Sequence, residues 1–162
     1  MQEPLAIHVH DHLAGSAFAI DLVESLRDHH STDSLSELAS SLLIEIKRDR
    51  EVLQSIADRV GKGTPDVKEA VAWAAEKVSR FKLSHNDSSG LGTFQAFESV
   101  ALGILGKLAL WRTLAVLAHN DDRLRGFDFE TLIARAQQQH SQVEECRLAL
   151  AGQVFEAPRP KK

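Results

Sequence analysis

FESVALGILGKLALWRTLAVLA, residues 97–118, is the stretch that decides the fold. It is an almost unbroken apolar run, and its length favours a helix buried among other helices. One lysine, Lys107, stands in its middle, on the helix face that also carries Val100, Trp111 and Leu114. That face is expected to be turned away from water, so this lysine needs an acidic partner.

The acidic partner is expected on another helix, where two carboxylates fall among apolar side chains. Glu45 and Asp49 lie one turn apart, near the centre of the apolar face of their segment. Unpaired carboxylates in a core are strongly disfavoured, so they require cations, a metal or hydrogen-bond donors. We therefore expect a buried charge network of Glu45, Asp49 and Lys107 that specifies which helices pair. The alternative is a rotated helix from which the Lys107 side chain extends outward to water.

The remainder of the chain also has the pattern of helices. Apolar residues recur at helical spacing, strand-like alternation is absent, and Gly, Pro and capping residues mark the segment ends. The expected helices cover residues 4–29, 35–60, 65–83, 93–119 and 128–155. All but the third are long, at roughly 39 Å. This order predicts an all-α four-helix bundle of two long helix pairs with a shorter connecting helix; the alternative is an up-and-down bundle of five helices.

Length and composition fit one helical-bundle domain over residues 1–157, followed by a basic tail at 158–162. The formal net charge of −4 argues against a nucleic-acid partner, because such proteins normally show a basic stripe. The single cysteine, Cys146, excludes an internal disulfide. Lys107 and Arg112 make the apolar run costly to place in a membrane, and the N-terminus lacks the pattern of a signal peptide. We therefore expect a cytoplasmic protein with no membrane partner.

Two inward carboxylates in the middle of a long helix resemble the ferritin-like superfamily of helical bundles. Three segments, 11–15 (DHLAG), 73–77 (WAAEK) and 106–112 (GKLALWR), are also similar to a bacterial family of small helical proteins with no assigned function. The second similarity spans most of the chain. Together the resemblances imply a ferritin-like fold, and they supply no activity.

The resemblance to the di-iron members of that superfamily does not extend to their ligands. Those proteins use a Glu-x-x-His pair on each of two helices, and this sequence contains no Glu-x-x-His. Arg48 stands three residues after Glu45, and the nearest imitation is Gln137 with His140. Lys107 would also add a positive charge where a metal must lie. We therefore expect no metal and no cofactor.

Two functions follow from these patterns. The first is a non-catalytic scaffold or interaction protein, expected as a homodimer, in which Trp73 either packs within the chain or marks a partner surface. The second is a metal-dependent, carboxylate-bridged oxidoreductase or iron-handling protein. Its ligands would be Glu45 and Asp49, joined by His12 or Glu24 from the first expected helix.

A third function is a bundle that binds a small ligand. Gly103 and Gly106 remove side-chain bulk from one face of the apolar run, and a cavity beside them would accept a ligand. The sequence has no nucleophile elbow and no phosphate-binding loop, so no catalytic residue is assigned.

Overall fold

The computed structural model describes residues 3–29, 34–63, 72, 75–76, 79 and 89–156. These residues form four long α-helices, α1 (Pro4–His29), α2 (Ser34–Val60), α4 (Leu91–Leu117) and α5 (Phe129–Val154), and a 3-10 turn, η1 (Asp122–Leu124). No strand occurs within these ranges, so the expected all-α class is confirmed. Most of the expected helix at 65–83, including Trp73, and the tail at 158–162 lie outside the described residues.

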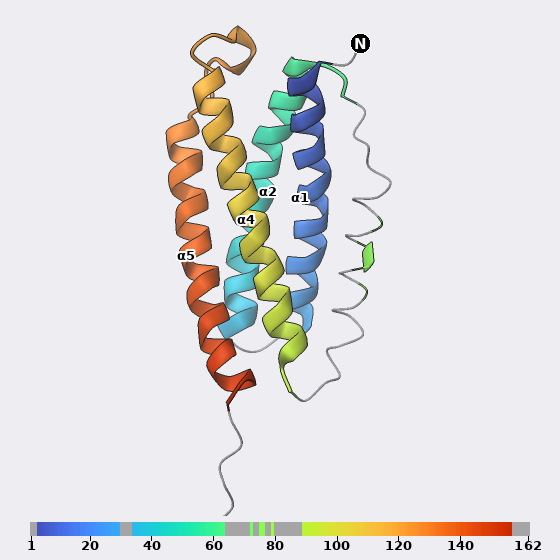
Figure 1. Ribbon diagram of the computed structural model, residues 1–162, viewed down its shortest axis with the longest axis vertical. Coiled ribbons are helices and arrows are strands. Elements are labelled where there is room, and N and C mark those ends of the chain that lie inside the picture. The colour runs from blue at the N-terminus through green and yellow to red at the C-terminus, as the bar shows by residue number, and fades with distance from the viewer. Residues whose placement is uncertain are drawn as a thin grey trace, which may run out of the picture.

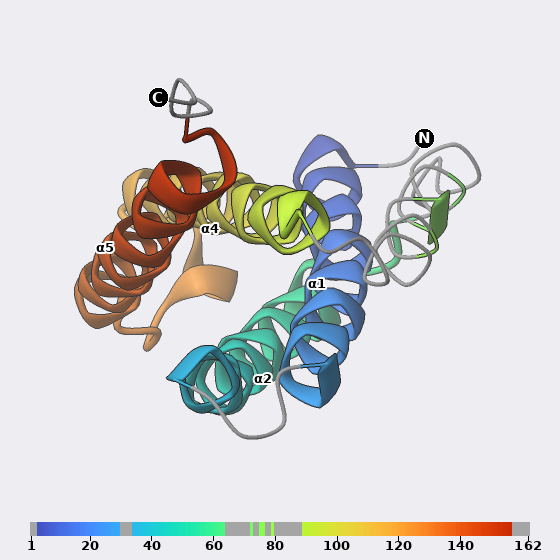
Figure 2. The same ribbon diagram turned by 90° about the horizontal axis from the view of Figure 1, so that it is seen from below.

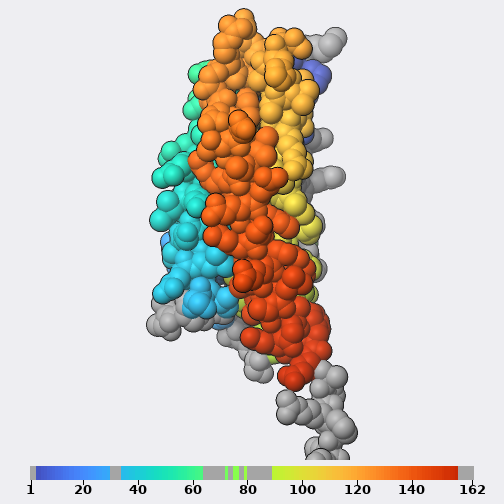
Figure 3. Space-filling model, turned by 90° about the vertical axis from the view of Figure 1, so that its left-hand side faces the viewer, coloured from blue at the N-terminus to red at the C-terminus, as the bar shows by residue number. Residues whose placement is uncertain are grey.

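The four helices run side by side as two antiparallel pairs (Figure 1). α1 packs along α2, and α4 packs along α5. The pairs meet where α1 lies beside α4 (Figure 2), and α5 runs along α2 and α4 on the opposite side (Figure 3). α2 ends at the upper end of the bundle in Figure 1 and α4 begins at the lower end.

Local sequence explains where these helices begin and end. Gly61 takes a φ of +94° directly after α2, and Gly90 takes a φ of +74° directly before α4. Both values lie in the left-handed region that glycine adopts without a steric cost. α4 therefore begins at Leu91, slightly before the expected residue 93. α5 begins after Asp128, whose carboxylate accepts a hydrogen bond from the backbone N–H of Thr131 at 3.0 Å.

Buried apolar side chains form two clusters along the bundle axis, named here by their place in Figure 1. The upper cluster lies where α1 begins and the lower cluster where α1 ends. Buried members of the upper cluster include Val9, Ile56, Trp111, Leu114 and Ala136, and those of the lower cluster include Leu22, Leu42, Phe97, Ile104 and Val143. Each buried aliphatic or Phe side chain contributes about 1.5–3 kcal/mol, so both clusters stabilise the bundle.

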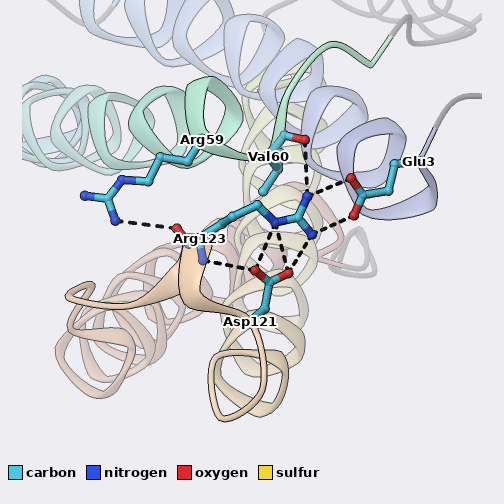
Figure 4. Close-up of polar contacts among 5 residues, drawn as sticks. All are labelled: Glu3, Arg59, Val60, Asp121 and Arg123. Atoms are coloured by element: carbon cyan, nitrogen blue, oxygen red, sulfur yellow. Dashed lines mark hydrogen bonds and ion pairs between the residues drawn. The ribbon is translucent and has the colours of Figure 1, made fainter.

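An arginine joins three segments at the upper end of the bundle (Figure 4). The Arg123 guanidinium in η1 donates to both carboxylate oxygens of Glu3 at 2.6 Å and to Asp121 Oδ2 at 2.6 Å. It also approaches the Val60 carbonyl at 3.5 Å, and Arg59 donates to the Arg123 carbonyl at 3.4 Å. These contacts hold the pKa values of Glu3 and Asp121 below their usual range. We call this group the Arg123 clasp.

α4 is the most apolar helix and carries apolar side chains on its outer surface as well. Leu102, Leu105, Ala109 and Val116 are exposed and recur at helical spacing; we call them the outer row of α4. Among the described residues, α4 alone has the length and apolar composition to cross a membrane, which the core helix of a water-soluble protein can also have.

Candidate functional site

A group of charged and polar side chains lies in the middle of the bundle. Lys107 Nζ donates to Asp49 Oδ2 at 2.7 Å and to Gln139 Oε1 at 2.5 Å. Arg135 Nη1 donates to Asp49 Oδ1 at 2.6 Å. Gln139 Nε2 donates to Glu45 Oε2 at 2.8 Å and lies 3.3 Å from Asp49 Oδ2. We call these five residues the charge layer, because they connect α2, α4 and α5 at one level.

The charged side chains of the charge layer are largely buried. The side chains of Asp49 and Lys107 are only 2% and 17% exposed, and Gln139 is fully buried. Burial lowers the pKa of Lys107, while the charges of Asp49 and Glu45 act in the opposite direction. The Lys107 ammonium is therefore directed at partners within the bundle and not outward to water.

The sequence predicted a network of Glu45, Asp49 and Lys107, but it did not predict that α5 contributes Arg135 and Gln139 to it. Glu45 reaches the other two through the side-chain amide of Gln139, with no direct hydrogen bond or ion pair to Lys107 among the described contacts. One signal was present in the sequence, since Gln139 continues the inward row formed by Leu132, Ala136 and Val143.

A pocket of about 660 Å³ opens beside the charge layer, between α1 and α4, with α2 as its floor. Three glycines line it, Gly15 on α1 and Gly103 and Gly106 on α4. A Cβ atom added at any of them would meet no heavy atom within 4 Å. The pocket therefore lies beside the two glycines at which the sequence suggested a cavity.

The floor of the pocket carries Arg50 of α2. Its Nη1 donates to the Leu13 carbonyl at 2.5 Å and to the Ser16 hydroxyl. Both acceptors are neutral, and no carboxylate within the described part of the chain forms an ion pair with Arg50. A half-buried guanidinium therefore faces the pocket without a counter-ion from those residues.

The wall of the pocket carries Trp111, one turn after Lys107 on α4. The Trp111 side chain is fully buried, and its Nε1–H has no hydrogen-bond partner among the described residues. A buried donor without an acceptor costs roughly 1–3 kcal/mol. Because this nitrogen has almost no accessible surface, protein atoms cover it and it is not presented to the open part of the pocket.

The residues considered as metal ligands do not form one site. His12 packs edge-to-face against His8 at a centroid distance of 4.8 Å, and Glu24 pairs with Lys47 at 3.0 Å. Glu24 lies about 18 Å along α1 from His12 at the helical rise. Asp49 is engaged by two cations. Across the described ranges, no group of three or more His, Cys, Asp or Glu side chains is arranged to hold a metal.

Comparisons of the chain with protein families, with curated proteins and with solved structures found no match.

Proposed function

We propose that this chain is a non-catalytic bundle that binds a small ligand in the pocket between α1 and α4. The observation that carries the proposal is a pocket of about 660 Å³ lined by three glycines with open space beside them and by the half-buried Arg50 guanidinium. Ligand pockets are typically apolar with a few polar groups that fix orientation, and this pocket has that composition.

The three glycines support the proposal through their energetic cost. Each lies inside a helix, where glycine costs about 1 kcal/mol relative to alanine. Steric crowding does not require glycine at Gly15, Gly103 or Gly106, because the space beside each is open. Glycine at these three positions lowers helix stability but leaves space along the pocket. A ligand-binding role explains why glycine occurs there.

The charge layer supports a structural role for the central acids. Asp49 already has two cationic partners, so a metal ion would have to displace Lys107 and Arg135. We propose that the layer fixes the register of α2, α4 and α5 within a ferritin-like bundle. Elemental analysis of the purified protein tests this part, because stoichiometric iron, manganese or zinc would contradict it.

The outer row of α4 supports a second proposal, that two copies of the chain associate in the cytoplasm. Leu105 and Val116 are 43% and 68% exposed, and exposed apolar side chains that gather on one face mark an interaction surface. A homodimer would cover the row.

Binding of N-phenylnaphthylamine, a neutral apolar fluorescent probe, tests the main proposal. We expect saturable binding of one probe per chain by the wild-type protein. Gly106→Leu should abolish it by filling the pocket, while Gly152→Leu on α5, away from the pocket, should leave it unchanged. Equal probe binding by wild type and Gly106→Leu would contradict the proposal.

A further inference from the structure

We infer that the ligand of this pocket is an amphiphile with a carboxylate head and an unbranched apolar tail. The inference rests on the proposed function and adds the chemical class of the ligand. It combines a cation without a counter-ion among the described residues, one further donor on α4, and apolar walls beside them.

The cation is Arg50. Its two described acceptors, the Leu13 carbonyl and the Ser16 hydroxyl, are neutral and both are reached by Nη1. The Nε and Nη2 groups have no acceptor among the described residues. A guanidinium stays charged at all physiological pH values, and it pairs best with a carboxylate through two parallel hydrogen bonds. A carboxylate head would supply that pair.

One further donor is Lys107, which lines the pocket on α4. Two of the three ammonium N–H groups of Lys107 point to Asp49 and Gln139, which leaves one. Lys107 therefore favours an oxygen acceptor and not a cationic or donor-rich ligand.

The acids around the pocket do not cancel the charge of Arg50. Asp49 is neutralised by Lys107 and Arg135 in the charge layer. Asp11 and Glu98 line the pocket but are exposed, where water screens them. Neither forms an ion pair with Arg50 in the described structure. The buried side of the pocket therefore carries a net positive charge, which is that of Arg50.

The apolar walls extend from this level toward the lower end of the bundle. Phe18 and Leu22 follow Ser16 on α1, and Val100 and Ile104 precede Lys107 on the antiparallel α4. A tail along these walls would place the head beside Arg50 and the chain against the lower cluster. The volume of about 660 Å³ is within the range of small-molecule sites.

The test compares three ligands that share one tail: dodecanoate, dodecanol and dodecyltrimethylammonium. They are titrated calorimetrically, the two ionic ligands below their critical micelle concentrations and dodecanol below its solubility limit. We expect one dodecanoate per chain, bound about tenfold or more tightly than the other two, because the head gains charge-assisted hydrogen bonds. Arg50→Gln should reduce dodecanoate affinity about tenfold and leave dodecanol affinity unchanged. Arg50→Lys should retain part of the preference for dodecanoate over dodecanol. Arg48 is an exposed arginine on the same helix, and Arg48→Gln should retain the whole preference.

The outcomes separate this inference from the proposed function. If dodecanol or the ammonium compound binds as tightly as dodecanoate, and Gly106→Leu blocks that binding, the pocket is a ligand site and the carboxylate inference is wrong. If none of the three binds saturably to the folded protein, both the inference and the proposed function are wrong. Circular dichroism of each variant confirms that folding is retained.

Discussion

The Lys107 ammonium lies between Asp49, whose charge it neutralises, and the amide oxygen of Gln139. We expect Lys107→Met to lower the free energy of unfolding by about 3 kcal/mol, because it leaves a buried carboxylate with one cation fewer. The value is at the lower end of the usual ~3–5 kcal/mol range, because Arg135 still pairs with Asp49. Urea denaturation measures the difference.

The matched control is Lys47→Met, which breaks the Glu24 pair on the surface. These side chains are 50% and 36% exposed, so the loss should stay below about 1 kcal/mol. A loss below ~0.5 kcal/mol for Lys107→Met as well would show that the buried pair contributes little. Apolar replacement of Asp49 and Lys107 together recovers stability only if Arg135 is changed too, since it would otherwise lose its carboxylate.

His12 gives the protein a pH dependence with a defined sign. Burial, followed by the nearby His8, lowers the pKa of His12 below its ordinary value of 6.5. The unfolded chain therefore takes up this proton at a higher pH than the folded chain. The free energy of unfolding should fall as pH decreases from 6.5 through the lowered pKa.

His12→Gln should flatten this dependence, and His119→Gln, at an exposed position, should leave it unchanged. Histidine titration by NMR provides the direct measurement. An His12 pKa at or above 6.5 would contradict the expectation.

At the scale of the elements, the chain leaving α2 passes very close to α1. A Cβ atom on Gly63 would lie 2.5 Å from the Ala6 carbonyl oxygen, and backbone cannot rotate away as a flexible side chain can. We expect Gly63→Ala to cost about 1–3 kcal/mol in thermal or urea unfolding, as overpacking does. The same substitution at Gly152 in α5 should instead stabilise by up to ~1 kcal/mol, because space is open there and alanine favours the helix. A stabilised Gly63→Ala variant would contradict the close approach.

The helices themselves could be predicted from the sequence, because their signals are local. α1 spans the expected residues 4–29, and the ends of α2 and α5 differ from the expected ones by about one residue, within the usual scatter. Which helix faces pack against each other could not be predicted in the same way, because those contacts join residues far apart in the sequence. Glu45 and Asp49 indicate that cations are needed, but only the packing of α5 against α2 reveals that Arg135 and Gln139 complete the set. η1 was also missed, since a single 3-10 turn leaves almost no periodicity.

At the scale of the whole molecule, the outer row of α4 predicts self-association. If two copies pair through this row, Leu105→Glu with Val116→Glu should convert a dimer into a monomer, because four charges would be placed in the apolar contact. Sedimentation velocity measures the state directly. Gln138→Glu, an exposed change on α5, should leave the dimer intact. A wild-type protein that stays monomeric at high micromolar concentration would contradict the prediction.

The division of the core into two clusters also affects how the bundle opens. The charge layer interrupts the apolar contacts between them, so loosening at one end is transmitted poorly to the other. The Arg123 clasp ties the upper end together across three segments. Amide exchange in the native state should therefore divide into two cooperative units, and the unit at the clasped end should exchange more slowly. If the pocket binds a long-chain ligand, the faster unit would provide the route by which that ligand enters.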